Sequence, residues 1–139
     1  MKETMILIID GQGGRIGAQL VAQLKQQAPG AVITAVGTNS MATSAMLKAG
    51  ADQAATGENA VLTCCRRAHV IAGPLGIAVA DSFLGEVTPA MAVAVGQSCA
   101  AKILLPVNRC QSIVAGTAQM TRTQLVEEAA AQILSMCHA

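Results

Sequence analysis

A glycine-rich turn near the amino terminus carries the clearest chemical signal in the sequence. Gly11, Gly14 and Gly17 fit the spacing GxxGxxG, and with Gly13 the segment also fits GxGxxxG. It stands between an apolar run and a helical pattern, which is the context of a phosphate-binding turn. Backbone amides without side chains can approach a phosphate closely, and the dipole of the following helix favours an anion. A tight turn also needs glycine for its backbone alone, so both interpretations stay open.

Alternating apolar runs and helical patterns must position this turn. Strands are expected at residues 4–9, 31–36, 52–55, 70–72 and 102–105, with 112–115 as a sixth. Helices are expected at 15–28, after a cap at Asn39 or Ser40, in a segment that Thr56, Gly57 and Glu58 open, at 89–97 behind a capping Thr88, and behind a capping box of Thr121 and Gln124. Such alternation implies right-handed βαβ units. The expected fold is α/β, a single Rossmann-like domain over residues 1–139 whose doubly wound, mostly parallel sheet of five or six strands has helices on both faces.

The ends of the expected strands extend the candidate site beyond the glycine turn. In a doubly wound sheet, ligands bind beyond the carboxyl ends of the strands, and the residues there are small, polar or glycine, as in many ordinary loops. The predicted cofactor-binding residues are Asp10, Gly11, Gln12, Gly13, Gly14, Arg15, Ile16, Gly17, Thr38, Asn39, Ser40, Gly73, Pro74, Gly76 and Asn108. This prediction fails if the protein's own side chains fill the glycine turn.

The predicted ligand is a phosphate-containing small molecule whose identity the sequence leaves open. NAD or NADP would suit the turn. However, residues 37–40 at the end of the second expected strand lack the acidic residue that binds the ribose of NAD and the Arg that accommodates the phosphate of NADP. Arg15 would contact a diphosphate or lie in solvent. The turn lacks the GK[ST] ending of phosphate-loop NTPases, so hydrolysis of ATP is not expected.

Composition excludes several classes of protein. An apolar content of 53%, a mean hydropathy of +0.50 and a net charge of +1 rule out a disordered chain. Nucleic-acid binding is not expected, because basic residues are not clustered and Phe83 is the single aromatic residue. The first apolar run is too short for a signal peptide, and no uncharged window reaches the ~20 apolar residues that span a bilayer. We expect a cytoplasmic protein with no membrane partner.

The cysteines predict neither disulfides nor a metal site. Five cysteines at irregular spacings are typical of free thiols in a reducing compartment. Cys64, Cys65 and His69 stand close together, but no CxxC or HxxxH pair accompanies them. No metal is therefore expected.

Several segments resemble one family of proteins. They are IDGQGGRIG, GTNSMATSAMLKAGA, ATGENAV, GPLGIAVADSFLGEVTPAMA and LPVNRC, which together span most of the chain. They resemble a family of small, uncharacterised, Rossmann-like bacterial proteins of about this length, which share a domain of unknown function. The resemblance implies a Rossmann-like fold and carries over no activity, cofactor or catalytic residue.

Length and charge favour a binding module. The expected elements use all 139 residues and leave no second domain to hold a substrate. This favours a nucleotide or dinucleotide binding module that acts with a partner chain or as an oligomer. The charged content of 12% is about half the usual ~25%. It favours a homo-oligomer, a dimer in the simplest case, or alternatively a structural or regulatory subunit of an assembly.

A small enzyme, NAD(P)-dependent or not, is the remaining alternative, with its site at the carboxyl ends of the strands. No catalytic residue is assigned, because no Ser/His/Asp set or Cys/His pair comes together. The groups available to such an enzyme are Asp10, Glu58, Asp81 and Glu86 as acid or base and Cys110 as nucleophile.

Overall fold

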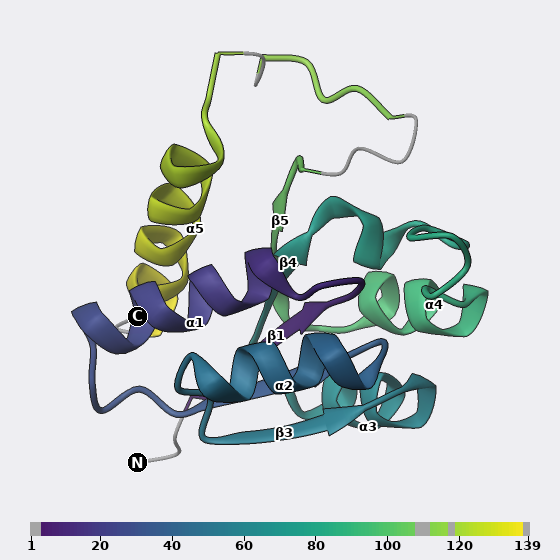
Figure 1. The fold of residues 1–139 in the computed structure, drawn as a ribbon, viewed down its shortest axis with the longest axis horizontal. Coiled ribbons are helices and arrows are strands. Elements are labelled where there is room, and N and C mark those ends of the chain that lie inside the picture. The colour runs from purple at the N-terminus through teal and green to yellow at the C-terminus, as the bar shows by residue number, and fades with distance from the viewer. Residues whose placement is uncertain (1–3, 108–111, 117–118, 138–139) are drawn as a thin grey trace.

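Strands and helices alternate along the chain in the computed structural model, which describes residues 4–107, 112–116 and 119–137 (Figure 1). The strands are β1 (Ile6–Asp10), β2 (Ile33–Gly37), β3 (Gln53–Thr56), β4 (Val70–Pro74) and β5 (Ala101–Leu105). The helices are α1 (Arg15–Gln27), α2 (Ser40–Lys48), α3 (Glu58–Arg67), α4 (Pro89–Gln97) and α5 (Arg122–Cys137), with a short 3-10 helix, η1 (Leu75–Ala78), after β4. The first five predicted strands are confirmed to within two residues.

All five strands are parallel and lie in the order β3-β2-β1-β4-β5. The chain runs from β1 outward to β3 and then crosses back to β4, so the strand order reverses between β1 and β4. Ligands of such sheets bind in the crevice beyond the carboxyl ends of the strands at this reversal. β1 ends at Asp10, beside Gly37 of β2, so the glycine turn begins at the crevice. The predicted Rossmann-like, doubly wound fold is confirmed.

Helices cover both faces of the sheet. Ile6 and Ile8 of β1 pack in one core with α1, α2 and α5, whereas Leu7 and Ile9 pack in a second core with α3 and α4. A strand that is covered on both faces is apolar throughout, which explains the unbroken run ILII. None of the helices in the described ranges is long and apolar enough to cross a membrane.

Local capping signals fix where the helices begin. The side chain of Asn39 accepts a hydrogen bond from the Ala42 amide at 2.9 Å, and Thr88 caps α4 by accepting from the Met91 amide at 3.1 Å. Ahead of α5, the Thr121 hydroxyl accepts from the Gln124 amide, and the Gln124 side chain accepts from the Thr121 amide. The predicted caps are thus confirmed, and α5 begins with a complete capping box.

The predicted sixth strand, residues 112–115, is wrong. Residues 112–116 form no strand, and the side chain of Ile113 is 88% exposed. Residues 112–116 lie away from the sheet in Figure 1, and α5 packs beside β5. A short apolar run becomes a strand only where a neighbouring strand supplies its hydrogen bonds, and residues 112–116 are not part of any strand of the sheet.

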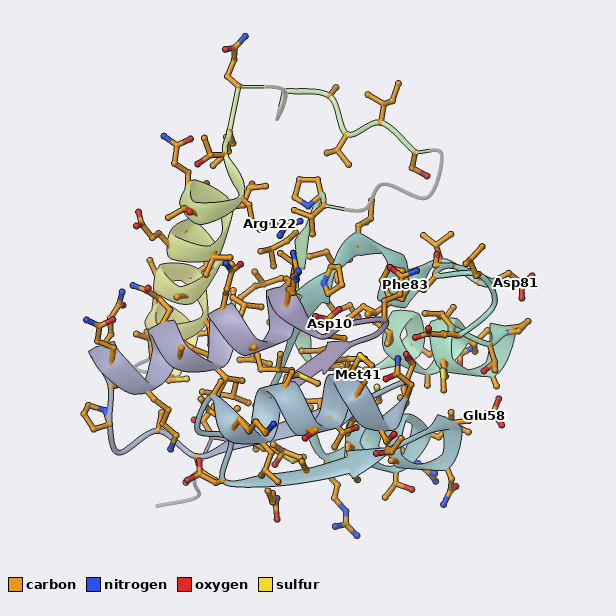
Figure 2. The ribbon with its side chains drawn as sticks, viewed as in Figure 1. Asp10, Met41, Glu58, Asp81, Phe83 and Arg122 are labelled. Atoms are coloured by element: carbon orange, nitrogen blue, oxygen red, sulfur yellow. The ribbon has the colours of Figure 1, made fainter. Side chains whose placement is uncertain are left out.

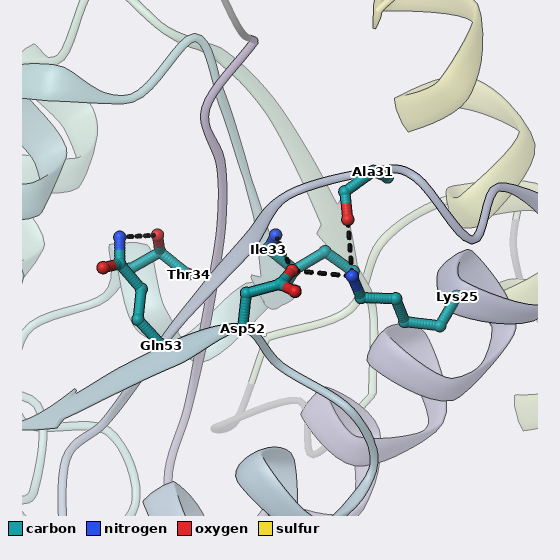
Figure 3. Close-up of polar contacts among 6 residues, drawn as sticks. All are labelled: Lys25, Ala31, Ile33, Thr34, Asp52 and Gln53. Atoms are coloured by element: carbon teal, nitrogen blue, oxygen red, sulfur yellow. Dashed lines mark hydrogen bonds and ion pairs between the residues drawn. The ribbon is translucent and has the colours of Figure 1, made fainter.

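Polar contacts at the amino end of the sheet join β2, β3 and α1 (Figure 3). One oxygen of the Asp52 carboxylate accepts from the Ile33 amide at 2.7 Å and pairs with the Lys25 ammonium at 2.7 Å. The Lys25 ammonium, by its hydrogen bond and its charge, and the Ile33 amide lower the pKa of Asp52. Beside them, the Gln53 amide donates to the Thr34 hydroxyl at 2.8 Å. These contacts set the register of β2 against β3 at the end of the sheet opposite to the crevice.

Close packing of α1 on the sheet depends on Gly17. A matched pair of substitutions tests this dependence. A Cβ at Gly17 would lie 2.5 Å from Met46 Sδ and 2.9 Å from Asp10 Cβ, so Gly17→Ala is expected to lower the free energy of unfolding by about 1–3 kcal/mol. A Cβ at Gly96 in α4 would have no atom within 4 Å, so Gly96→Ala is expected to raise it by up to about 1 kcal/mol. Urea unfolding of both variants measures the difference, and an undiminished stability of Gly17→Ala would contradict the packing.

Candidate functional site

A pocket of about 230 Å³ lies where β1 ends and α1 begins. Its lining residues are Asp10, Gly11, Gln12, Gly13, Gly14, Arg15, Ile16 and Arg122. All but the last belong to the predicted set. Arg122 comes from the start of α5, which packs beside α1 and brings this residue close to Asp10 (Figure 2).

Two glycines of the turn serve different purposes. Gly14 has a φ of 72° as the residue before α1, and a Cβ there would lie 2.7 Å from the backbone of Ala42. The backbone alone therefore requires Gly14. Gly13 is exposed and has no atom within 4 Å of the position of an added Cβ. The open face of the turn thus lies at Gly13.

The buried carboxylate of Asp10 occupies part of the amino end of α1. One of its oxygens accepts from the Gly11 amide at 2.8 Å, and the other accepts from the Gly17 amide at 2.7 Å. Burial raises the pKa of Asp10, and these backbone hydrogen bonds counteract the rise. The protein itself therefore supplies the anion for these amides.

A second carboxylate, Glu86, occupies the first half of the turn. Its Oε1 accepts from the Gln12 amide at 2.8 Å, the Thr38 hydroxyl at 2.7 Å and the Asn39 side-chain amide at 2.8 Å. Burial alone would raise the pKa of Glu86, but the hydrogen bonds from these residues hold it below its usual value. Thr38 and Asn39, predicted to bind a cofactor, thus contact a side chain of their own chain. In this half of the glycine turn, a side chain of the protein itself occupies the space, which is the condition under which the predicted ligand site fails.

Phe83 completes the cover over Gly11. A Cβ on Gly11 would lie 2.7 Å from Phe83 Cδ2, and one on Gly76 would lie 2.9 Å from Phe83 Cε1. These two glycines leave room for the ring of Phe83, which is buried. The side chains of Phe83 and Glu86 thus lie against Gly11, and the role of Gly11 and Gly76 as ligand contacts stays a prediction.

The segment that carries both side chains, residues 80–87, is strained, and we call it the strap. Asp81, Phe83 and Leu84 have φ values of 67°, 58° and 57°. Each such conformation costs a residue other than glycine about 1–2 kcal/mol. Leu84 is 99% exposed, and the buried hydroxyl of Ser82 has no hydrogen-bond partner among the described residues. The burial of Phe83 and the backbone hydrogen bonds between Asp81 or Ser82 and Val87 hold the strap against this strain.

The second half of the turn stays open and cationic. Within the described ranges, the amides of Gly13 and Arg15 have no acceptor within the protein. Arg15 and Arg122 are exposed, and neither belongs to the one ion pair found there, which joins Lys25 to Asp52. Open amides and unpaired guanidinium groups in one pocket are the groups that bind phosphate oxygens.

Other predicted residues lie away from the pocket. Gly17 packs against Asp10 and Met46 inside α1. Ser40 is exposed at the start of α2, and Gly73 and Pro74 are buried at the end of β4. Asn108 and Cys110 lie outside the described residues.

The remaining carboxylates give no catalytic set. Glu58 accepts a hydrogen bond from the Thr88 hydroxyl at 2.6 Å, which links the starts of α3 and α4. Asp81 is exposed in the strap. His69 stands at the opposite end of the sheet, where its Nδ1 accepts from the Met5 amide at 2.9 Å. No group of metal-ligating side chains comes together among the described residues.

Residues 5–138 match the family described as Domain of unknown function (DUF3842). The chain belongs to this family. This match confirms the resemblance that was identified from the sequence. None of the curated proteins is significantly similar to it. Among solved structures, it is similar to the dodecameric FMN-dependent Ubix-like decarboxylase from Escherichia coli O157:H7, with 14% identity, a TM-score of 0.43, and coverage of 97% of this chain and 95% of that chain.

The contact of Glu86 predicts a definite pH dependence of stability. Because its pKa is lower in the folded state than the usual 4.5, its stabilisation is complete above that value and is lost as the pH falls through the folded pKa. Glu86→Gln is expected to lower the free energy of unfolding by about 1 kcal/mol at pH 7, and the difference from wild type should shrink below pH 4.5. Urea unfolding between pH 3 and pH 7 measures it. A difference for Glu86→Gln that stays constant between pH 3 and pH 7 would contradict the contact.

The strain in the strap is testable at adjacent positions. Leu84→Gly should relieve a left-handed backbone at an exposed site and raise the free energy of unfolding by about 0.5–1 kcal/mol. Gly85 has a φ of 90°, so Gly85→Ala should lower it by about 1–2 kcal/mol. Thermal and urea unfolding compare the two variants, and effects of the same sign would show that the strap does not hold this conformation.

Proposed function

We propose that this chain is a binding module for a small molecule that carries a phosphate group. The phosphate would lie over residues 13–16 at the amino end of α1, between Arg15 and Arg122. The observation that carries the proposal is the lining of the pocket, in which α5 places Arg122 beside the open face of the glycine turn. The helix dipole adds to the attraction of an anion at this point.

The size of the pocket limits what part of the ligand it holds. Sites that enclose a whole drug-sized ligand measure about 300–1,000 Å³, and this pocket measures about 230 Å³. It suits one phosphoryl group, with the rest of a nucleotide outside it. NAD and NADP thus stay within the proposal as phosphate carriers, together with simpler nucleotides.

Binding without catalysis is the form we favour. No cysteine or histidine from the described ranges lines the pocket, so it offers a ligand neither a thiol nor an imidazole. A reaction would then need a partner chain or a second copy. The homo-oligomer, in its simplest form a dimer, stays a prediction.

Titration calorimetry and thermal unfolding with orthophosphate, pyrophosphate, ADP, ATP, NAD, NADP and FAD test the proposal. A ligand at 100 times its dissociation constant should stabilise the protein by about 2.7 kcal/mol. Arg122→Gln and Arg15→Gln should each weaken binding about fivefold to tenfold, because each removes one charge-assisted contact of about 1–1.4 kcal/mol.

Arg67→Gln is the matched control, since Arg67 is exposed at the far end of α3 and its loss should leave binding unchanged. Absence of binding by every compound, or equal binding by Arg122→Gln and Arg67→Gln, would overturn the proposed function.

A further inference from the structure

The Glu86 carboxylate occupies a site built for an anionic oxygen. A backbone amide, a hydroxyl and a side-chain amide from two separate segments converge on its Oε1 at 2.7–2.8 Å. Gln12 stands next to Gly13, which faces the open half of the turn. Several donors that meet at one charged oxygen are also what binds an oxygen of a phosphate. The turn therefore presents two adjacent anion positions, of which the protein fills one.

We propose that Gln12, Thr38 and Asn39 form a second anion subsite, and that Glu86 is its tethered occupant, which the second phosphoryl group of a diphosphate displaces. This inference rests on the proposed function, which places the first phosphoryl group over residues 13–16. It narrows the ligand class to compounds with two linked phosphoryl groups. A monophosphate would leave Glu86 in place.

The geometry allows Glu86 to leave without unfolding the strap. The strap holds its own backbone bonds, from the Asp81 amide to the Val87 carbonyl at 2.7 Å and from the Val87 amide to the Ser82 carbonyl at 3.1 Å. Rotation of the Glu86 side chain exchanges three protein contacts for three contacts to phosphate and leaves these bonds intact.

Because Glu86 occupies the subsite, the apparent affinity for a diphosphate is the intrinsic affinity multiplied by the fraction of molecules in which the subsite is vacant. If the subsite is vacant in about one molecule in ten, removal of the carboxylate strengthens diphosphate binding about tenfold. Calorimetry with pyrophosphate should therefore give about tenfold tighter binding to Glu86→Ala than to wild type. Glu86→Gln, which keeps the shape and removes the charge, should show a smaller gain in the same direction and serves if Glu86→Ala does not fold.

Asp81→Asn is the matched control, because Asp81 lies in the same strap, is exposed and takes no part in the hydrogen bonds of the subsite. It removes the same charge and should leave pyrophosphate affinity within twofold of wild type. Orthophosphate at the first subsite should gain less than pyrophosphate from Glu86→Ala.

Each outcome decides the matter. A gain confined to the Glu86 variants and larger for pyrophosphate supports the subsite. Equal gains for Asp81→Asn and Glu86→Gln, or unchanged affinity in both Glu86 variants, would overturn the inference while Arg122-dependent binding kept the proposed function intact. Pyrophosphate that binds neither wild type nor any variant would overturn the inference, whereas the proposed function would be overturned only if the other phosphate compounds also failed to bind.

Discussion

The backbone amides between β1 and α1 must find acceptors, and this requirement governs the structure around the glycine turn. A helix leaves its first amides without partners inside the helix, and here the sheet crevice brings them together with the ends of β1 and β2. Asp10 and Glu86 meet part of the need from within the chain. The buried position of Asp10, the strained strap and the close contact of Phe83 with Gly11 all follow from holding two carboxylates at one helix start.

The turn is thus divided into two halves of different character. Around Gly11 it is packed against side chains of the same chain, and around Gly13 it is open beside Arg15 and Arg122. The backbone requirement for glycine applies at Gly14, whereas the phosphate-binding interpretation stays a proposal for the turn around Gly13. The backbone conformation requires a glycine at position 14, whereas the space beside Gly13 is open to solvent or to a ligand. This division locates the proposed phosphate in the second half of the motif.

The fold could be predicted because its signals are local. The apolar run of β1, the capping side chain of Asn39 and the box of Thr121 and Gln124 each depend on residues a few positions apart. The failure at residues 112–115 is of another kind, because the apolar run there matches a strand locally, whereas strand pairing depends on segments far away in the sequence. The site could be predicted as far as the motif reaches, from Asp10 to Ile16. What the sequence could not reveal depends on contacts across long separations. Glu86 bonds to Gln12 across 74 positions, and Arg122 reaches the turn only because α5 packs beside α1. No sequence motif indicates that the Glu86 carboxylate accepts the hydrogen bonds of Gln12, Thr38 and Asn39.

We propose that a phosphate group lies over the open half of the turn. Two-dimensional ¹H–¹⁵N NMR of the labelled protein during a pyrophosphate titration measures this directly, since the amides of Gly13 and Arg15 report contact with an oxygen. These two resonances are expected to shift saturably, with one dissociation constant that increases in Arg122→Gln. Unmoved resonances at Gly13 and Arg15, while other parts of the protein respond, would contradict it.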